Sequence, residues 1–177
     1  LKNKPSYVGR YLDSVFDIVL NFMIFMAICW VSKTTFWYAF AAFFGIQLQG
    51  TLYNYYYVIL RHKSVGGDST SKIFEYKTPK ALPGETQKSV TLLFRIYTIV
   101  YGLFDKIIHA LDQEAYKVKT FPNWFMSLLS IYGLGFQLLI IAVMLPLHLI
   151  EYIAPFFIAY TLMIFVLIAI RKRFISE

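Results

Sequence analysis

Two aspartates, Asp13 and Asp17, lie one helical turn apart in a stretch that otherwise has the composition of a membrane-spanning helix. Residues four apart on a helix point the same way, about 5 to 6 Å apart, so the two carboxylates repel unless a proton or a cation lies between them. A carboxylate at bilayer depth costs roughly 2.5 to 3.5 kcal/mol on insertion scales, and such residues mark functional sites. The pair therefore predicts a site for a divalent cation.

The chemistry of the acidic pair favours magnesium. Carboxylate oxygens are hard ligands that suit Mg²⁺ or Mn²⁺, and also Ca²⁺, whereas the sequence has no Cys/His cluster of the kind that binds zinc. Magnesium usually takes one or two protein carboxylates and fills its shell with water and substrate phosphates, so the pair predicts a phosphate-bearing substrate. A salt bridge from Asp13 to Arg10, or to a partner outside this chain, is the alternative.

Polar residues continue the helix face that carries the two acids. Gly9, Asp13, Asp17 and Asn21 recur every four residues, with Arg10 beside them. The line begins at the polar end of the helix and runs inward along a single face. It predicts that this face of the helix borders a protein cavity rather than lipid.

A second polar line runs along the next predicted helix toward a basic cluster. It consists of Gln47, Gly50, Thr51, Asn54, Tyr57 and Arg61. Two such lines predict a hydrophilic cavity open to the cytoplasm, where Asn54 and the basic residues Arg10, Arg61 and Lys63 bind the substrate. Two alternatives stay open, because amides also pair between helices, as Gln47, Gln49 and Asn54 could, and basic residues also determine topology.

The composition is that of an integral membrane protein. Of the 177 residues 58% are hydrophobic, above the roughly 45 to 50% of soluble domains. The 17 Lys and Arg against 10 Asp and Glu give a net charge of +7. In a membrane protein this charge marks cytoplasmic loops and anionic lipid headgroups rather than a nucleic-acid surface. The single cysteine, Cys29, excludes a disulfide framework.

The hydropathy pattern predicts an all-α helical membrane bundle in one domain of residues 1–177. Four segments are long and apolar enough to cross about 30 Å of hydrocarbon. They cover about residues 11–31, 36–60, 124–146 and 150–170. Residues 61–88, rich in Gly, Pro and Lys or Arg, are predicted to form a loop on the cytoplasmic side.

Residues 89–112 predict an amphipathic helix. Its polar residues recur at spacings of three and four: Thr91, Arg95, Thr98, Gly102, Asp105, Lys106, His109 and Asp112. Such a helix lies in the membrane interface, or spans the membrane with its stripe toward a protein cavity. The interfacial arrangement keeps the basic run from Arg171 to Arg173 on the cytoplasmic side, so the positive-inside rule favours it.

The pattern Gly9-x-x-x-Asp13-x-x-x-Asp17 resembles the second half of the signature of the CDP-alcohol phosphatidyltransferases. That signature reads Asp-x-x-Asp-Gly-x-x-Ala-Arg, then a short linker, then Gly-x-x-x-Asp-x-x-x-Asp. The residues before Gly9 have the length of the linker, so the resemblance implies that the first half lies upstream of Leu1. Family members typically have six spanning helices, and this chain would then be the C-terminal part of such a domain.

The resemblance implies a metal-dependent reaction of phospholipid synthesis. A phosphatidyl or related phosphoalcohol group would pass from a CDP-linked donor to a hydroxyl acceptor, with release of CMP. Asp13 and Asp17 would bind the metal, Mg²⁺ or Mn²⁺, and Asp17 would also be the base that deprotonates the acceptor hydroxyl. Gly9 would let the backbone approach the nucleotide.

The expected partners are the CDP-linked lipid donor, a small or lipid alcohol and membrane lipids, and the pattern also allows a homodimer. The site would face the cytoplasm, in a bacterial inner membrane or the endoplasmic reticulum. Two other classes of function stay open. An ion-coupled transporter would use the acids to bind a translocated cation, and a non-catalytic membrane subunit would use the polar lines for packing.

Overall fold

The computed structural model describes residues 5–64, 75 and 77–175 of the chain. The described part is about 80% helical and contains no strand, which confirms the all-α fold class. The α-helices are α1 (Tyr7–Ser32), α2 (Phe36–Ser64), α3 (Gln87–Leu111), α4 (Asn123–Leu129), α5 (Leu134–Met144), α6 (Ile150–Thr161) and α7 (Met163–Phe174). Two short 3₁₀ turns, η1 (Ala115–Lys117) and η2 (Ser130–Tyr132), precede α4 and α5.

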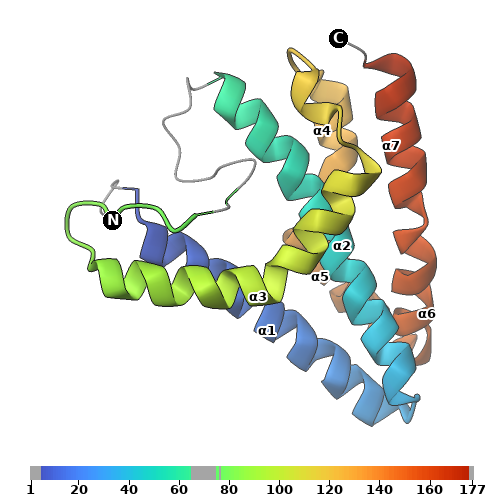
Figure 1. The fold of residues 1–177 in the computed structure, drawn as a ribbon. Helices are drawn as coiled ribbons and strands as arrows, with labels where there is room; N and C mark the ends of the chain where they lie inside the picture. The colour runs from blue at the N-terminus through green and yellow to red at the C-terminus, as the bar shows by residue number, and fades with distance from the viewer. Residues whose placement is uncertain (1–4, 65–74, 76, 176–177) are drawn as a thin grey trace.

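Helices α1 and α2 form an antiparallel hairpin. The chain reverses after Lys33, which adopts the left-handed conformation (φ 53°) that ends many helices. From this turn the two helices diverge toward their other ends, so that α1 leans away from α2 (Figure 1). The diverging hairpin leaves room between the start of α1 and the middle of α2.

The predicted span over residues 124–146 is not one straight helix. Its two parts, Asn123–Tyr132 and Leu134–Met144, meet at Gly133 with a bend of 50°. Gly133 has an extended backbone (φ −66°, ψ 144°), so the helical hydrogen bonds are interrupted there. A short turn then leads to α6 and α7, which together form a 25-residue segment from Ile150 to Phe174.

Among the described residues two helical segments are long and apolar enough to cross a membrane, α1 and the α6–α7 segment. The bent pair would add a third if it counts as one span. Helix α2 is long enough, but polar side chains such as Gln47, Gln49 and Asn54 interrupt its apolar sequence. The expected count of four spans is therefore not confirmed.

Helix α2 packs closely against α6 in the core. Gly45 of α2 lies against Thr161 and the carbonyl of Phe157, with no space for a side chain. Small residues at helix interfaces let the backbones approach in this way. On the same face of α2, the Gln49 side chain donates hydrogen bonds to Phe157 O (3.2 Å) and Thr161 Oγ1 (2.9 Å). Gln49 thus pairs between helices, which was one of the alternatives for the amide residues of this helix.

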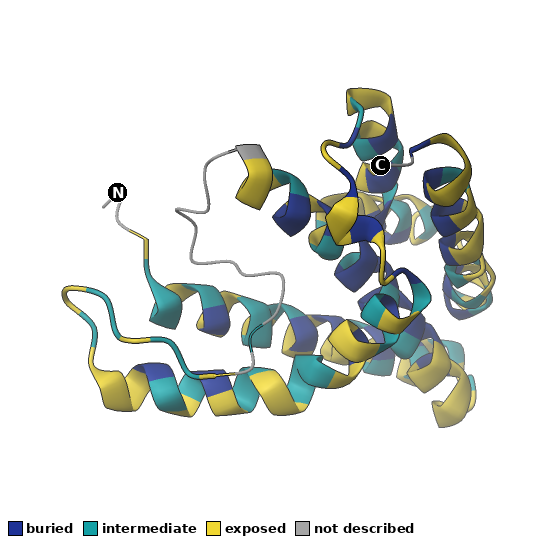
Figure 2. Cartoon of the chain, turned by 45° about the horizontal axis from the view of Figure 1, so that its top comes forward, coloured by how far each residue is buried: buried dark blue, intermediate teal, exposed yellow. Residues whose placement is uncertain are grey.

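Helix α3 runs beside the first half of α1, as Figure 2 shows. Tyr11 of α1 is fully buried against Val90 and Phe94 of α3. Three apolar side chains at helical spacing face outward from α3, with exposed fractions of 60% for Leu92, 81% for Ile99 and 55% for Leu103. The helix is amphipathic as predicted, although the structure contains no membrane that would fix its depth.

The end of α3 is joined to α7 by a buried ion pair. Asp112 is fully buried and pairs with Arg171 through both carboxylate oxygens, while Tyr56 donates a further hydrogen bond to Asp112 Oδ2 (2.6 Å). Lys63, near the end of α2, donates to the carbonyls of Tyr116 and Val118. The C-terminal ends of α2 and α7 therefore lie at the same end of the bundle (Figure 1).

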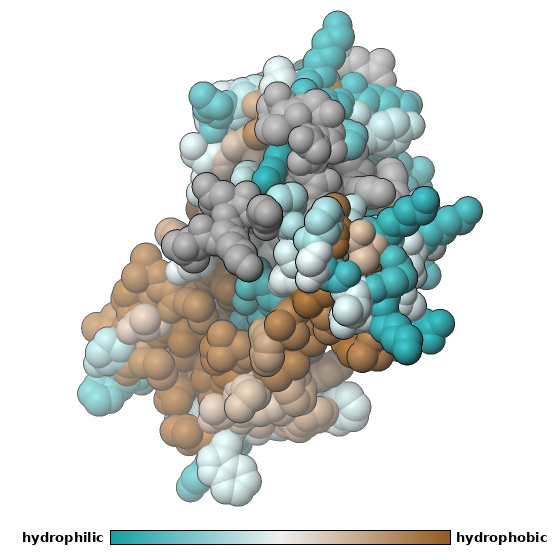
Figure 3. All heavy atoms as spheres, turned by 90° about the vertical axis from the view of Figure 1, so that its left-hand side faces the viewer, coloured by the Kyte–Doolittle hydropathy of each residue, from teal (hydrophilic) through white to brown (hydrophobic). Residues whose placement is uncertain are grey.

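The surface separates into an apolar and a polar part. In the view of Figure 3 the lower part is mostly hydrophobic, and hydrophilic side chains gather toward the top. The exposed apolar side chains include Phe16, Met23, Trp30 and Trp37, with exposed fractions between 62% and 84%. An apolar surface of this extent is typical of a protein whose helices contact lipid.

Candidate functional site

A cavity of about 330 Å³ lies in the space between the diverging helices α1 and α2. Residues from α1, α2, α3 and the η2–α5 segment line it. They include Arg10, Asp13, Ser14, Asp17, Asn21, Gln47, Gly50, Thr51, Asn54, Tyr97, Tyr101, Asp105, Tyr132 and Gln137. The structure thus brings the predicted acidic pair, Asn54 and Arg10 into one cavity.

The acidic wall of this cavity comes from α1. Asp13, Asp17 and Asn21 follow one another at intervals of one turn, and all three line the cavity. Asp13 is exposed to the cavity, Asp17 is half-buried and Asn21 is buried. The polar line that the sequence predicts on this helix therefore faces protein rather than lipid.

The start of α1, which carries this wall, is held by a network of hydrogen bonds. Ser6 caps the helix by accepting from the Gly9 N–H (2.9 Å), and Glu85 accepts from Ser6 Oγ (2.6 Å) and the Val8 N–H (2.8 Å). Partial burial opposes the charge of Glu85, but these hydrogen bonds and one from the Leu82 N–H (3.2 Å) lower its pKa. Glu85 thereby ties the segment before α3 to the first turn of α1.

The opposite wall comes from α2. Gln47, Thr51 and Asn54 line the cavity at spacings of four and three residues. Gln47 is 3% exposed, and its Nε2 has no hydrogen-bond partner within the described residues. A buried amide donor without a partner is costly, so this atom indicates a place where a ligand oxygen can bind.

Asp105 and Tyr97 of α3 complete the cavity on its third side. Tyr97 donates a hydrogen bond to Asp105 Oδ2 (3.3 Å). Asp105 is accessible from the cavity but is surrounded by protein on its other sides, and this burial raises its pKa to about 6. The hydrogen bond from Tyr97 and the charge of Arg10 oppose that rise. Of the polar stripe predicted for residues 89–112, Asp105 lines this cavity, whereas Asp112 is paired with Arg171.

Arg10 lines the cavity as an ion-paired residue. Its guanidinium donates to Glu75 Oε2 at 2.5 Å, and the same oxygen accepts from Tyr11 (2.9 Å). The guanidinium also lies 4.5 Å from the centre of the Tyr11 ring. Among the described ion pairs Arg10 thus binds Glu75 and not Asp13, which was the alternative explanation for the acidic pair.

Three of the predicted substrate-binding residues do not line this cavity. Gly9 lies in the first turn of α1, where its N–H is used by the cap. Arg61 and Lys63 lie near the far end of α2, and the Lys63 ammonium donates to backbone carbonyls after α3. Gly9 lies one turn before Asp13 but outside the cavity lining, and Arg61 and Lys63 do not line the cavity either. The predicted contact of these three residues with a substrate stays untested.

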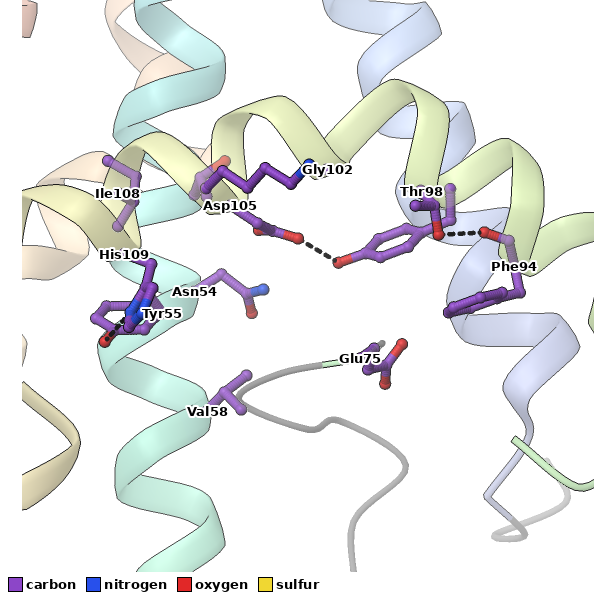
Figure 4. A pocket seen from close by; sticks show the side chains of 13 residues that line it. Asn54, Tyr55, Val58, Glu75, Phe94, Thr98, Gly102, Asp105, Ile108 and His109 are labelled. Atoms are coloured by element: carbon purple, nitrogen blue, oxygen red, sulfur yellow. Dashed lines mark hydrogen bonds between the residues drawn. The ribbon is translucent and has the colours of Figure 1, made fainter. Parts of the chain in front are cut away.

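A second cavity of about 310 Å³ adjoins the first. It lies between α2, α3 and Glu75, and it shares Thr51, Asn54, Val58, Tyr97 and Asp105 with the first cavity. Figure 4 shows Asn54, Glu75, Phe94 and Asp105 around this space. The two cavities therefore meet at a common wall.

The residues that the sequence interpretation left out come mainly from α3 and α5. Asp105 and Tyr97 belong to a helix that was predicted but given no site role. Gln137 is a polar residue within an apolar segment, and its Nε2 donates to Gln49 Oε1 (3.0 Å) beside the cavity. A polar residue inside a predicted span was the signal that could have identified it.

The donors on the acidic wall fit a magnesium ion. Asp13 and Asp17 offer carboxylates, and Ser14 and Asn21 offer further oxygens on the same side. No group of three or more His, Cys, Asp or Glu suited to a metal occurs in the described ranges. Two carboxylates are what Mg²⁺ usually takes, because water and phosphate complete its shell.

Comparison with family models, curated proteins and solved structures gives no match to this chain.

Proposed function

We propose that this protein transfers a phosphatidyl or related phosphoalcohol group from a CDP-linked donor to a hydroxyl acceptor and releases CMP. The observation that carries the proposal is the convergence of Asp13, Asp17, Asn54 and Arg10 on one polar cavity in a largely apolar helical protein. Paired acids in such a setting are costly, and a bound cation with a phosphate ligand compensates that cost.

In the proposed reaction Asp13 and Asp17 hold the magnesium ion. When bound, the ion polarises the phosphoryl oxygens and stabilises the negative charge that develops on the CMP leaving group. The unpartnered Nε2 of Gln47 and the side chain of Asn54 face the same space and can donate to phosphate or ribose oxygens. In this proposal the two side chains would orient the donor in the cavity that Asp17 also lines.

Asp17 acts as the general base. It takes the proton of the acceptor hydroxyl as the oxygen forms a bond to the phosphorus atom and the bond from phosphorus to the CMP oxygen breaks. The proton thus moves to Asp17, and the electron pair of the broken bond leaves with CMP. Arg10, held in place by Glu75, supplies positive charge at the edge of the cavity for the donor phosphates.

The orientation in the membrane follows from the charges. The ends of α2 and α7, which carry Arg61, Lys63 and Arg173, lie at one end of the bundle. By the positive-inside rule this end faces the cytoplasm, and α3 lies along the interface with Leu92, Ile99 and Leu103 toward lipid. The cavity then opens at the cytoplasmic leaflet.

Nucleotide binding and turnover test the proposal on the natural protein in detergent or nanodiscs. We expect CDP to bind in the presence of Mg²⁺ and to be lost with EDTA. Asp17→Asn should retain much of the CDP binding and lose turnover, commonly about 10²-fold or more for a general base. Asp13→Asn should weaken the dependence of CDP binding on Mg²⁺.

Glu114→Gln is the matched control, because Glu114 is an exposed acid on the turn after α3 that pairs only locally with Lys117. It should leave CDP binding and turnover at the wild-type level. Turnover that persists in Asp17→Asn would refute the base assignment. CDP binding that EDTA does not weaken would refute the metal site. Full function of both Asp13→Asn and Asp17→Asn would favour a non-catalytic subunit.

A further inference from the structure

The second cavity carries two carboxylates whose hydrogen-bonding capacity the described residues do not fill. The Glu75 side chain is 10% exposed, and its Oε2 accepts from Arg10 and Tyr11. Its Oε1 is buried and has no hydrogen-bond partner among the residues that the structure describes. A buried carboxylate oxygen without a donor is unfavourable unless a ligand supplies one.

Asp105 lies across the same cavity from Glu75, as Figure 4 shows. It accepts one hydrogen bond, from Tyr97, and has no ion-pair partner in the described part of the chain. The charged and titratable groups around it are Glu75, Tyr97, Arg10, Lys106 and His109. Because Arg10 is already paired with Glu75, it leaves the charge of Asp105 only partly compensated.

Aromatic and amide side chains form part of the remaining lining, which also includes Lys106, His109 and several hydroxyl and aliphatic residues. The Phe94 ring borders it, and the Tyr97 side chain lies beside Asp105. Rings next to carboxylates attract ammonium groups, because the ring face is negative and the carboxylate supplies charge and acceptors. Asn54 on the wall toward the first cavity can bind a hydroxyl group.

We infer that this second cavity binds a small alcohol that carries a primary ammonium group, with the ammonium between Glu75 and Asp105 and the hydroxyl near Asn54. The role of this alcohol rests on the proposed transfer reaction, in which the alcohol would be the hydroxyl acceptor. A phosphorylated alcohol fits poorly, because its anion would approach two carboxylates. A quaternary ammonium lacks the N–H donors that Glu75 Oε1 and Asp105 can accept.

Direct binding tests this inference without turnover. Ethanolamine, choline, glycerol and glycerol 3-phosphate are titrated calorimetrically into the natural protein in nanodiscs, with and without CDP and Mg²⁺. We expect ethanolamine to bind tightest. Asp105→Asn should weaken ethanolamine binding about tenfold or more, the usual scale for a hydrogen bond to a charged group. The same variant should change glycerol binding little.

The control again is Glu114→Gln, which removes one negative charge outside both cavities. It should leave ethanolamine binding unchanged. Phe94→Leu tests the aromatic wall separately and should weaken ethanolamine more than glycerol. Ethanolamine that binds no better than glycerol, or glycerol 3-phosphate that binds best, would overturn the inference.

The outcomes for the two proposals are distinguishable. If CDP binds with Mg²⁺ and ethanolamine does not bind, the transfer reaction stands and the ammonium site is refuted. If ethanolamine binds through Asp105 but CDP does not bind, the site stands and the transfer reaction fails.

Discussion

Replacement of Gly45 by alanine should destabilise the protein through a steric clash between α2 and α6. A Cβ atom at Gly45 would lie 2.3 Å from Thr161 Oγ1, a distance that requires the hydroxyl to move. That hydroxyl is held on both sides, since it donates to Phe157 O (2.7 Å) and accepts from Gln49 Nε2 (2.9 Å). The clash therefore also breaks hydrogen bonds that join the two helices.

The expected loss in the free energy of unfolding is about 3 kcal/mol. Overpacking of a tight interface costs about 1 to 3 kcal/mol. Each lost hydrogen bond adds about 1 kcal/mol. Against this, alanine favours the helix over glycine by about 1 kcal/mol. For a chain of this length the net loss should lower the melting temperature by about 6 to 12 °C.

Thermal unfolding in detergent, followed by circular dichroism, measures this difference. Gly50→Ala is the matched control, because no heavy atom lies within 4 Å of a Cβ at that position. It should stabilise the protein by about 0.5 to 1 kcal/mol through helix propensity. In a Thr161→Ala background, which removes the hydroxyl, Gly45→Ala should cost little. Equal melting temperatures for Gly45→Ala and Gly50→Ala would refute the close approach of α2 and α6.

Two further perturbations concern charges. Arg171→Met should lower the free energy of unfolding by about 3 to 5 kcal/mol, because it leaves the buried Asp112 carboxylate without its counter-charge. Arg173→Met, at the exposed end of α7, is the control and should change the free energy of unfolding little. Denaturant unfolding measures both variants. The raised pKa of Asp105, about 6, means that the folded state favours its protonated form, so its charge lowers stability progressively as pH rises from the ordinary carboxyl pKa to about 6. Asp105→Asn should therefore raise the melting temperature above that of wild type more at neutral pH than at about pH 4, and an equal difference at both would contradict the raised pKa of Asp105.

The helices themselves could be predicted from hydropathy, because long apolar runs and their breaks are local properties of the sequence. The predicted range 89–112 agrees with α3 to within two residues at each end. The bend at Gly133 could not be predicted in this way. The segment around it is mostly apolar, and although Gly133 and Gly135 mark a place where a helix can break, no local pattern specifies the angle of 50° between its two parts.

The site was predictable where residues lie on one helix and was not where they come from several. The periodicity of four places Asp13, Asp17 and Asn21 on one face of α1 from sequence alone. The placement of Asp105 on the same cavity depends on how α3 crosses α1, which no local pattern specifies. Likewise, basic charge alone suggested Lys63 as a substrate ligand. In the structure its ammonium group donates hydrogen bonds to the backbone carbonyls of Tyr116 and Val118.

The wall common to the two cavities has a thermodynamic consequence. Thr51, Asn54 and Asp105 line both cavities, so under the two proposals above the occupant of one cavity would change the free energy of binding in the other. Such coupling is reciprocal: each ligand alters the affinity of its neighbour by the same factor. A cation that neutralises Asp105 from one side would thus favour an anionic phosphate on the other, and binding in the two cavities would be cooperative rather than independent.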